Sequence, residues 1–324
     1  MGIVGIVRGT KIAGDNCAKQ RIRARIFGDA DGKCGNSNLR GARALPPGEQ
    51  SVPMIEVKDG TRLYYKDWGH GPAVVLSHGW PLNSDMWENQ MMHLASNGFR
   101  VIAHDRRGFG RSDQPWDGYD HDTFADDLAA LIEHLDLKDV TLVGYAMGGG
   151  EVTRYVGRHG SERVKGVVLI GATPPRLSWS EDYPNGVPQI VFDNVKAGLL
   201  ADRAEFMRGF ARLFFGADRE GAEVSEGQLA HIQHMALLGS LKAAHDAVTA
   251  CAMTDYREDI SGFDVPVLII HGEEDAFVPL SATAQQGIEL FPDATLKVYE
   301  GAPHAVLYTH AERLNADLME FISG

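Results

Sequence analysis

Residues 140–151 read Val-Thr-Leu-Val-Gly-Tyr-Ala-Met-Gly-Gly-Gly-Glu, an apolar strand followed by a glycine-rich turn. This order matches the strand, turn and helix of a nucleophile elbow, whose pattern is Gly-x-Ser-x-Gly. Gly144 and Gly148 occupy the two glycine positions, where a side chain would collide with the neighbouring strand and helix. Ala146 stands where the elbow carries its serine. The stretch therefore predicts a catalytic turn that lacks its reacting hydroxyl.

Short apolar runs on both sides of this stretch predict a buried sheet. They cover residues 73–77, 100–103, 140–143, 164–170, 265–270 and 294–299. Helical stretches such as 122–135 and 151–159 separate most of them, which is typical of an α/β protein with a mostly parallel, doubly wound sheet. Residues 54–58 and 62–68 alternate around Asp59-Gly60, a turn dipeptide that predicts an antiparallel hairpin.

One long segment interrupts the rhythm of strands. Between about residues 174 and 255 the pattern becomes that of four amphipathic helices, at 187–200, 203–215, 225–238 and 240–253. Because strands resume afterwards, we expect a helical cap (174–255) inserted into one core formed by residues 54–173 and 256–324. We expect the aromatic residues of the cap to lie mostly in its core, with one or two lining a pocket: Trp179, Phe206, Phe210, Phe214 and Phe215.

The first 53 residues differ from the rest in composition. Residues 1–50 hold nine basic and four acidic residues, a charge of +5, which leaves −18 for the remainder of a chain whose total is −13. The segment is rich in glycine and ends in Ala-Leu-Pro-Pro-Gly-Glu-Gln, which resembles a linker. We expect a disordered or weakly ordered extension. An upstream start or an artificially added segment is the favoured origin, ahead of a natural basic tail and of an organelle transit peptide.

Composition excludes several classes of function. At 44% hydrophobic and 23% charged residues the chain is an ordinary globular one, with no apolar run near the roughly 18 residues of a membrane span and no secretory signal pattern. We therefore expect a cytoplasmic protein. The net charge of −13 disfavours nucleic acid and anionic membranes as partners. Cys17, Cys34 and Cys251 have no spacing typical of a disulfide framework or a metal site.

Five motifs in a fixed order carry a family resemblance. They are His-Gly-Trp-Pro (78–81), Asp-Arg-Arg-Gly-Phe-Gly-Arg-Ser (105–112), Gly-Tyr-Ala-Met-Gly-Gly-Gly-Glu (144–151), His-Gly-Glu-Glu-Asp (271–275) and Gly-Ala-Pro-His (301–304). Together they resemble the α/β-hydrolase fold, and more narrowly the bacterial cofactor-free (non-heme) haloperoxidase, perhydrolase and arylesterase family. The resemblance covers residues 54–324, and Ala146 is its one departure.

The fold places its catalytic residues in the chain order nucleophile, acid, histidine. Asp275 follows an apolar strand and is the candidate acid, ahead of Glu273 and Glu274, and His304 is the candidate general base. We expect His78 to organise its own loop through hydrogen bonds. The other histidines are expected to be structural, among them His104, His121, His159, His231 and His310.

A tetrahedral intermediate needs two backbone N–H donors, one after the nucleophile and one after the third strand. These positions are Met147 and Trp80. Pro81 has no N–H and restricts Trp80, so it sets the direction of the Trp80 carbonyl. In the family that the chain resembles, proline here accompanies use of hydrogen peroxide, which makes Pro81 a candidate for orienting peroxide. The alternative is a turn proline without catalytic meaning.

The resemblance implies acyl transfer from small esters or carboxylic acids to water or hydrogen peroxide, with no cofactor and no metal. With alanine at position 146 the acyl-enzyme cannot form, and we expect a hydrolase that is inactive as it stands. The retained Asp275 and His304 favour a serine-to-alanine substitution over a natural ligand-binding relative. An enzyme of the epoxide hydrolase or dehalogenase type that has lost an aspartate nucleophile is a further alternative. Oligomeric state is left open, a homo-oligomer included.

Overall fold

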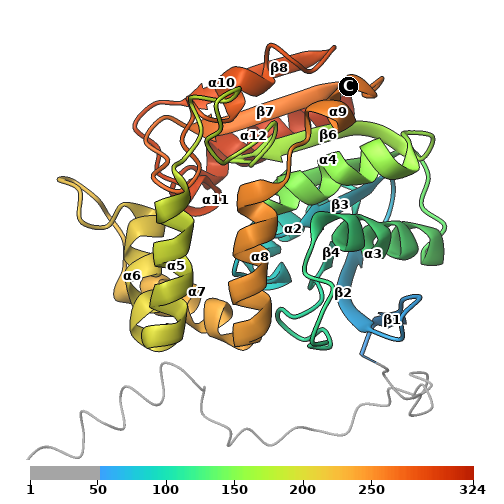
Figure 1. Ribbon diagram of the computed structural model, residues 1–324. Helices are drawn as coiled ribbons and strands as arrows, with labels where there is room; N and C mark the ends of the chain where they lie inside the picture. The colour runs from blue at the N-terminus through green and yellow to red at the C-terminus, as the bar shows by residue number, and fades with distance from the viewer. Residues whose placement is uncertain (1–51) are drawn as a thin grey trace, which may run out of the picture. The chain divides into compact units, whose positions relative to one another are not determined.

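The computed structural model describes residues 52–324. An eight-stranded sheet runs through the middle of this part of the chain (Figure 1). The strands are β1 Met54–Glu56, β2 Arg62–Gly69, β3 Ala73–Ser77, β4 Arg100–His104, β5 Val140–Tyr145, β6 Val164–Ile170, β7 Val267–Gly272 and β8 Ala294–Tyr299. Their order across the sheet is β1-β2-β4-β3-β5-β6-β7-β8. The predicted α/β class and mostly parallel sheet are confirmed.

Strand direction changes only at one edge of the sheet. β1 pairs antiparallel with β2, with Met54 opposite Tyr64, and β2 pairs antiparallel with β4. All other neighbours are parallel. The hairpin expected around Asp59-Gly60 is present, and Gly60 adopts a φ of +87° that suits glycine. The carboxyl ends of β3 to β8 therefore meet at one edge, where an α/β sheet carries its site.

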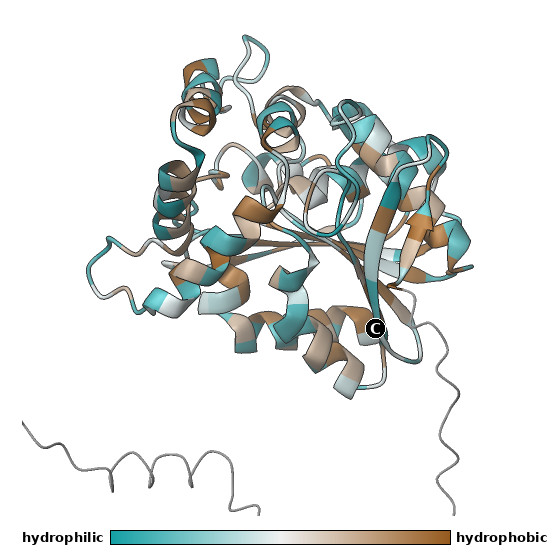
Figure 2. Ribbon diagram, turned by 90° about the horizontal axis from the view of Figure 1, so that it is seen from below, coloured by the Kyte–Doolittle hydropathy of each residue, from teal (hydrophilic) through white to brown (hydrophobic). Residues whose placement is uncertain are grey.

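Helices cover both faces of the sheet. They are η1 Ser84–Trp87, α2 Glu88–Ser96, α3 His121–His134, α4 Met147–His159, α5 Gln189–Ala201, α6 Arg203–Phe215, α7 Glu226–Leu238, α8 Leu241–Met253, α9 Arg257–Ser261, α10 Ala284–Gly287, α11 Val306–Thr309 and α12 Ala311–Ser323. Side chains of β3 alternate between two cores: Val74 and Leu76 pack with α2 and α12, whereas Val75 packs with α3 and α4. Figure 2 shows these apolar strands passing between the helical layers.

Helices α5 to α8 follow β6 and precede β7 in the chain. They stand together and form the inserted cap that the sequence predicted (Figure 1). Ser225 and Ser240, expected as the first helical residues of α7 and α8, are instead their N-caps, because each hydroxyl accepts a backbone N–H three residues on. Four of the five cap aromatic residues are buried or line a cavity. Trp179 does not follow that expectation and is 53% exposed, because it lies in the loop before α5.

The extension predicted for residues 1–53 falls almost wholly outside the described residues, and so do Cys17 and Cys34. Among the helices of residues 52–324, none combines the length and the apolar character that crossing a membrane requires.

Candidate active site

The turn between β5 and α4 has the backbone of a nucleophile elbow. Ala146 adopts φ 50° and ψ −115°, a conformation that an alanine rarely takes and that costs on the order of 1–3 kcal/mol. Hydrogen bonds hold it from both sides: its N–H donates to Ile170 O at 3.0 Å, and its carbonyl accepts from the N–H groups of Gly149 and Thr173. The strained turn is therefore fixed by the strand beside it and by its own helix.

The two elbow glycines are required by close backbone contacts. A Cβ on Gly144 would lie 2.4 Å from Gly148 O, and a Cβ on Gly148 would lie 2.3 Å from Ser77 O. The first turn of α4 thus rests directly on the end of β3.

We expect Gly148→Ala to lower the free energy of unfolding by about 2–3 kcal/mol, because the new methyl group must displace backbone in a packed core. Gly209→Ala is the matched control, since a Cβ there meets nothing within 4 Å and Gly209 lies inside helix α6. That control should gain roughly 0.5–1 kcal/mol. Urea unfolding of both variants checks the pair, and equal stability of the two would contradict the packing argument.

Asp275 and His304 form a buried pair at the carboxyl end of the sheet. His304 Nδ1 lies 2.5 Å from Asp275 Oδ2, and the other carboxylate oxygen accepts the N–H groups of Phe277 and Val278 at 2.9 and 2.8 Å. Burial alone would raise the pKa of Asp275, but the neighbouring His304 charge and hydrogen bond outweigh it and the pKa is lowered. The carboxylate therefore stays ionised and fixes the orientation of the His304 ring.

The competing acids of the same motif lie elsewhere. Glu274 is half exposed and pairs with Arg219 at 2.7 Å, and Glu273 accepts the N–H of Gly301 at 2.9 Å. Tyr145, the residue before Ala146, also holds the backbone of His304, because its buried hydroxyl donates to His304 O at 2.8 Å. Of the three acids, Asp275 is the one that the structure pairs with the histidine.

Residues 77–81, which are the last residue of β3 and the loop after it, bring Trp80 to the elbow. His78 Nε2 accepts the Arg106 N–H at 3.0 Å and its Nδ1 donates to Gly79 O, so the ring is neutral. Burial holds the pKa of His78 well below its usual value, in agreement with that state. His78 therefore organises its loop, as expected. The Trp80–Pro81 peptide bond is cis, and the Trp80 indole donates to Ala244 O in the cap at 2.8 Å.

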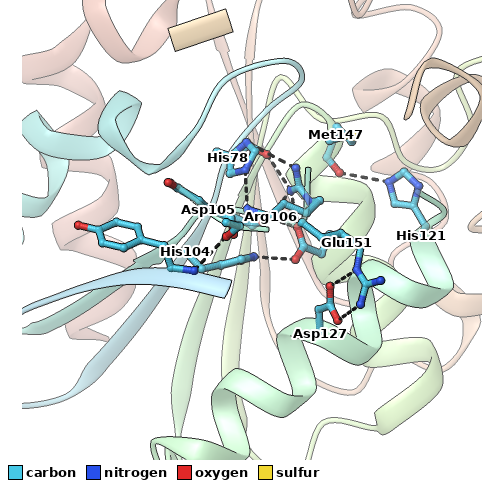
Figure 3. A network of polar contacts seen from close by, with 12 residues as sticks. His78, His104, Asp105, Arg106, His121, Asp127, Met147 and Glu151 are labelled. Carbon is cyan, nitrogen blue, oxygen red and sulfur yellow. Dashed lines mark hydrogen bonds and ion pairs between the residues drawn. The ribbon is translucent and has the colours of Figure 1, made fainter. Parts of the chain in front are cut away.

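Met147 begins helix α4, so its backbone N–H belongs to the first turn, where no carbonyl of the same helix can accept it. Its carbonyl lies 3.3 Å from His121 Nε2 (Figure 3). Trp80, Ala146, Met147 and His304 all line one cavity, whereas Asp275 lies behind His304. These five sequence-predicted residues therefore meet at a single place, whereas Pro81 is not among the residues that line the cavity.

This cavity, of about 440 Å³, opens between the sheet and the cap. Its walls are mainly apolar and come from the cap and the Asp275 loop, with Leu177, Val187, Phe192, Phe206, Phe210, Val248 and Phe277 among them. Cys251 also lines it, and burial raises the pKa of its thiol to about 12. A larger hollow of about 770 Å³ is lined by charged residues such as Arg219 and Glu274 and includes neither Ala146 nor His304.

A buried polar network that the sequence did not predict lies behind the elbow. Arg106 and Glu151, both 0% exposed, form an ion pair under the loop that carries Trp80, with Nε and Oε2 2.8 Å apart (Figure 3). One signal was available: Glu151 lies four residues from both Met147 and Tyr155, on the apolar side of α4.

Across residues 52–324, no group of three or more His, Cys, Asp or Glu side chains could hold a metal ion.

Known proteins share both the sequence and this architecture. The family model for the alpha/beta hydrolase fold matches residues 72–311. A non-heme chloroperoxidase of Kitasatospora aureofaciens is 46% identical over 84% of this chain and 100% of that protein, and a bifunctional esterase/perhydrolase of Acinetobacter calcoaceticus is 42% identical over 83% and 98%. The crystal structure of a bromoperoxidase from Bacillus anthracis gives a TM-score of 0.81 at 42% identity, over 84% of this chain and 99% of that one.

These matches span the whole region in which the five motifs occur, and they confirm the family resemblance that the motifs indicated. The chain belongs to the α/β-hydrolase fold family and, within it, to the non-heme haloperoxidase group.

Proposed function

We propose that this chain is the disabled form of a serine enzyme that transfers the acyl group of small esters. The observation that carries the proposal is the conjunction of a strained elbow at Ala146 and a buried Asp275–His304 pair on one apolar cavity. A serine at position 146 would lose its proton to His304 and attack the ester carbonyl. The C–O bond to the alcohol would then break, and the alcohol would leave with the proton from His304. Water or hydrogen peroxide would then release the acyl group as an acid or a peracid.

Alanine leaves the rest of this machinery without a nucleophile. The acid, the base and both N–H donor positions are retained, and Ala146 still adopts the strained backbone that exposes a nucleophile. A protein that only binds ligands gains nothing from a tuned acid–histidine pair or from this strain. The retained parts therefore favour loss of a serine over an ancestral binding role.

The test is Ala146→Ser beside the unchanged chain, in two assays. One follows hydrolysis of p-nitrophenyl acetate, and the other follows bromide oxidation that depends on acetate and hydrogen peroxide. Activity of the serine form alone supports a disabled acyl-transfer enzyme, and the ratio of the two rates places it between esterase and perhydrolase. No gain in either assay would move the proposal to the ligand-binding or aspartate-nucleophile alternative.

Pro81 is the residue proposed to favour peroxide as acyl acceptor. It removes one N–H from the loop and restricts Trp80, whose carbonyl is then aimed to accept a hydrogen bond from hydrogen peroxide. In the Ala146→Ser background we expect Pro81→Ala to reduce the ratio of perhydrolysis to hydrolysis about fivefold to tenfold, the value of one hydrogen bond. If the two rates fall together, Pro81 only shapes the loop.

A further inference from the structure

The ion pair between Arg106 and Glu151 links the two segments that would supply N–H donors. Arg106 follows β4 and Glu151 lies on α4 after β5, and these two strands flank β3 in the sheet. The two side chains therefore approach the end of β3 from opposite sides. They meet directly beneath residues 77–81, which we call the oxyanion loop (Figure 3).

Arg106 holds the oxyanion loop through three hydrogen bonds. Its Nη2 donates to Ser77 Oγ and to His78 O, each at 2.9 Å, and its backbone N–H donates to His78 Nε2 at 3.0 Å. These contacts end two residues before Trp80, so the direction in which the Trp80 N–H points depends on them.

Glu151 ties the same guanidinium group to the elbow helix. Its Oε2 accepts from Arg106 and from the Ser77 hydroxyl, and its Oε1 lies 2.9 Å from His104 Nε2. Glu151 lies one helical turn after Met147, on the helix whose first turn touches the end of β3. One ion pair thus connects the helix of the Met147 N–H with the loop of the Trp80 N–H.

We propose that the Arg106–Glu151 pair positions the oxyanion loop against the first turn of α4, so that the N–H groups of Trp80 and Met147 converge on one oxygen atom. Both residues act through the backbone of their neighbours and are positioning residues. The proposal rests on the proposed function, because an oxyanion forms only if the chain with serine at position 146 turns over an ester.

A structural role alone is a weak explanation of the pair. Two charges lose their hydration when they are buried, and apolar side chains of similar volume fill such space at equal or better stability. The guanidinium group of the pair directs its N–H donors at the oxyanion loop, and apolar side chains in the same place cannot donate such hydrogen bonds. A charge-neutral replacement therefore separates positioning from stability.

The experiment replaces both partners, as Arg106→Met/Glu151→Leu. The matched control is Arg107→Met/Asp127→Leu, which removes the adjacent buried pair, with Nε and Oδ2 2.6 Å apart. It also removes the bond from Arg107 to the half-exposed Asp59, but no hydrogen bond of residues 77–81. In the Ala146→Ser background we expect kcat to fall about 100-fold in the first double variant with KM within about threefold, the loss seen when one oxyanion donor is misplaced. The control should keep its kcat per folded molecule within about threefold.

Hydrogen exchange of the unchanged Ala146 chain gives a readout that needs no catalysis. We expect the amides of residues 79–80 to exchange roughly tenfold faster in the first double variant and at the original rate in the control. Unchanged exchange there overturns the proposal, and so does faster exchange with an unchanged kcat. Faster exchange in a chain that stays inactive with serine at position 146 supports the positioning and refutes the proposed function instead.

A second variant keeps the test decisive if the double variant does not fold. Arg106→Lys preserves the charge beside Glu151 but cannot reproduce the planar fork that reaches Ser77, His78 and Glu151 together. We expect its kcat to fall at least tenfold with KM retained. A kcat equal to that of the Ala146→Ser parent would show that charge alone suffices and would overturn the proposal.

Discussion

Ala146→Ser is expected to raise kcat for p-nitrophenyl acetate hydrolysis by roughly 10⁵- to 10⁶-fold over the unchanged chain. Removal of the serine from an intact triad costs about this factor, and what is left is the contribution of binding and of the oxyanion donors. The unchanged chain should therefore show only about a thousandfold acceleration over water. Stopped assays over hours are needed for the unchanged chain, and seconds suffice for the variant.

The gain should be nearly complete because the structure already supplies what the hydroxyl needs. Ala146 has the backbone of the elbow, so the substitution adds one oxygen to a Cβ that is in place. Space beside it is kept by Gly79, on which a Cβ would lie 3.2 Å from that of Ala146. Because Ala146 and His304 line the same cavity, we expect the variant to need no rearrangement of β5, α4 or the oxyanion loop.

Two further variants separate this result from its alternatives. Ala146→Ser/His304→Ala keeps the hydroxyl and removes the base, and it should return to the rate of the unchanged chain. Ala146→Asp tests the aspartate-nucleophile alternative with an epoxide and a haloalkane as substrates. If the Ala146→Asp variant turns over either substrate and the Ala146→Ser variant turns over no ester, the proposed acyl transfer is refuted.

The fold could be predicted from sequence because its signals are local and repeated. Runs such as 73–77 and 164–170 match strands β3 and β6 residue for residue, since a buried parallel strand is mainly apolar, with Lys165 of β6 as an exposed exception. The ends of helices were less exact where a cap was taken for the first turn, as at Ser225. Asp275 and His304 could be paired across 29 residues because their order in the chain is a property of the fold.

The buried network could not be predicted in the same way. A glutamate four residues into a helix is usually solvated. The one local signal, the place of Glu151 on the apolar side of α4, does not show that β3 and β4 cover it. Its partner Arg106 lies 45 residues away in the 105–112 motif, in which the sequence indicated no candidate site residue. Contacts of this kind follow from the order of strands in the sheet, which the periodicity of the sequence does not contain.

The second large effect is expected from Asp275→Asn in the Ala146→Ser background, a fall in kcat of about 10⁴-fold. Asp275 Oδ1 accepts two backbone N–H groups, so the carbonyl oxygen of an amide must take that place. The amide NH₂ is then directed at His304 Nδ1, where the carboxylate oxygen now lies. Nδ1 must accept instead of donate, and the ring proton moves to Nε2, the atom that has to take the proton of the serine.

Glu274→Gln is the matched control, because it changes the neighbouring acid of the same motif by the same single atom. Glu274 is half exposed and paired with Arg219, so its charge is screened and its loss should alter kcat by less than about twofold. Steady-state kinetics of the three enzymes, with KM measured beside kcat, checks the pair. KM should stay within about threefold in both variants, since the tautomer of His304 affects the transition state and not the cavity that holds the ester. Equal losses in the two variants would show that general charge near the cavity, and not the tautomer set by Asp275, supports the histidine.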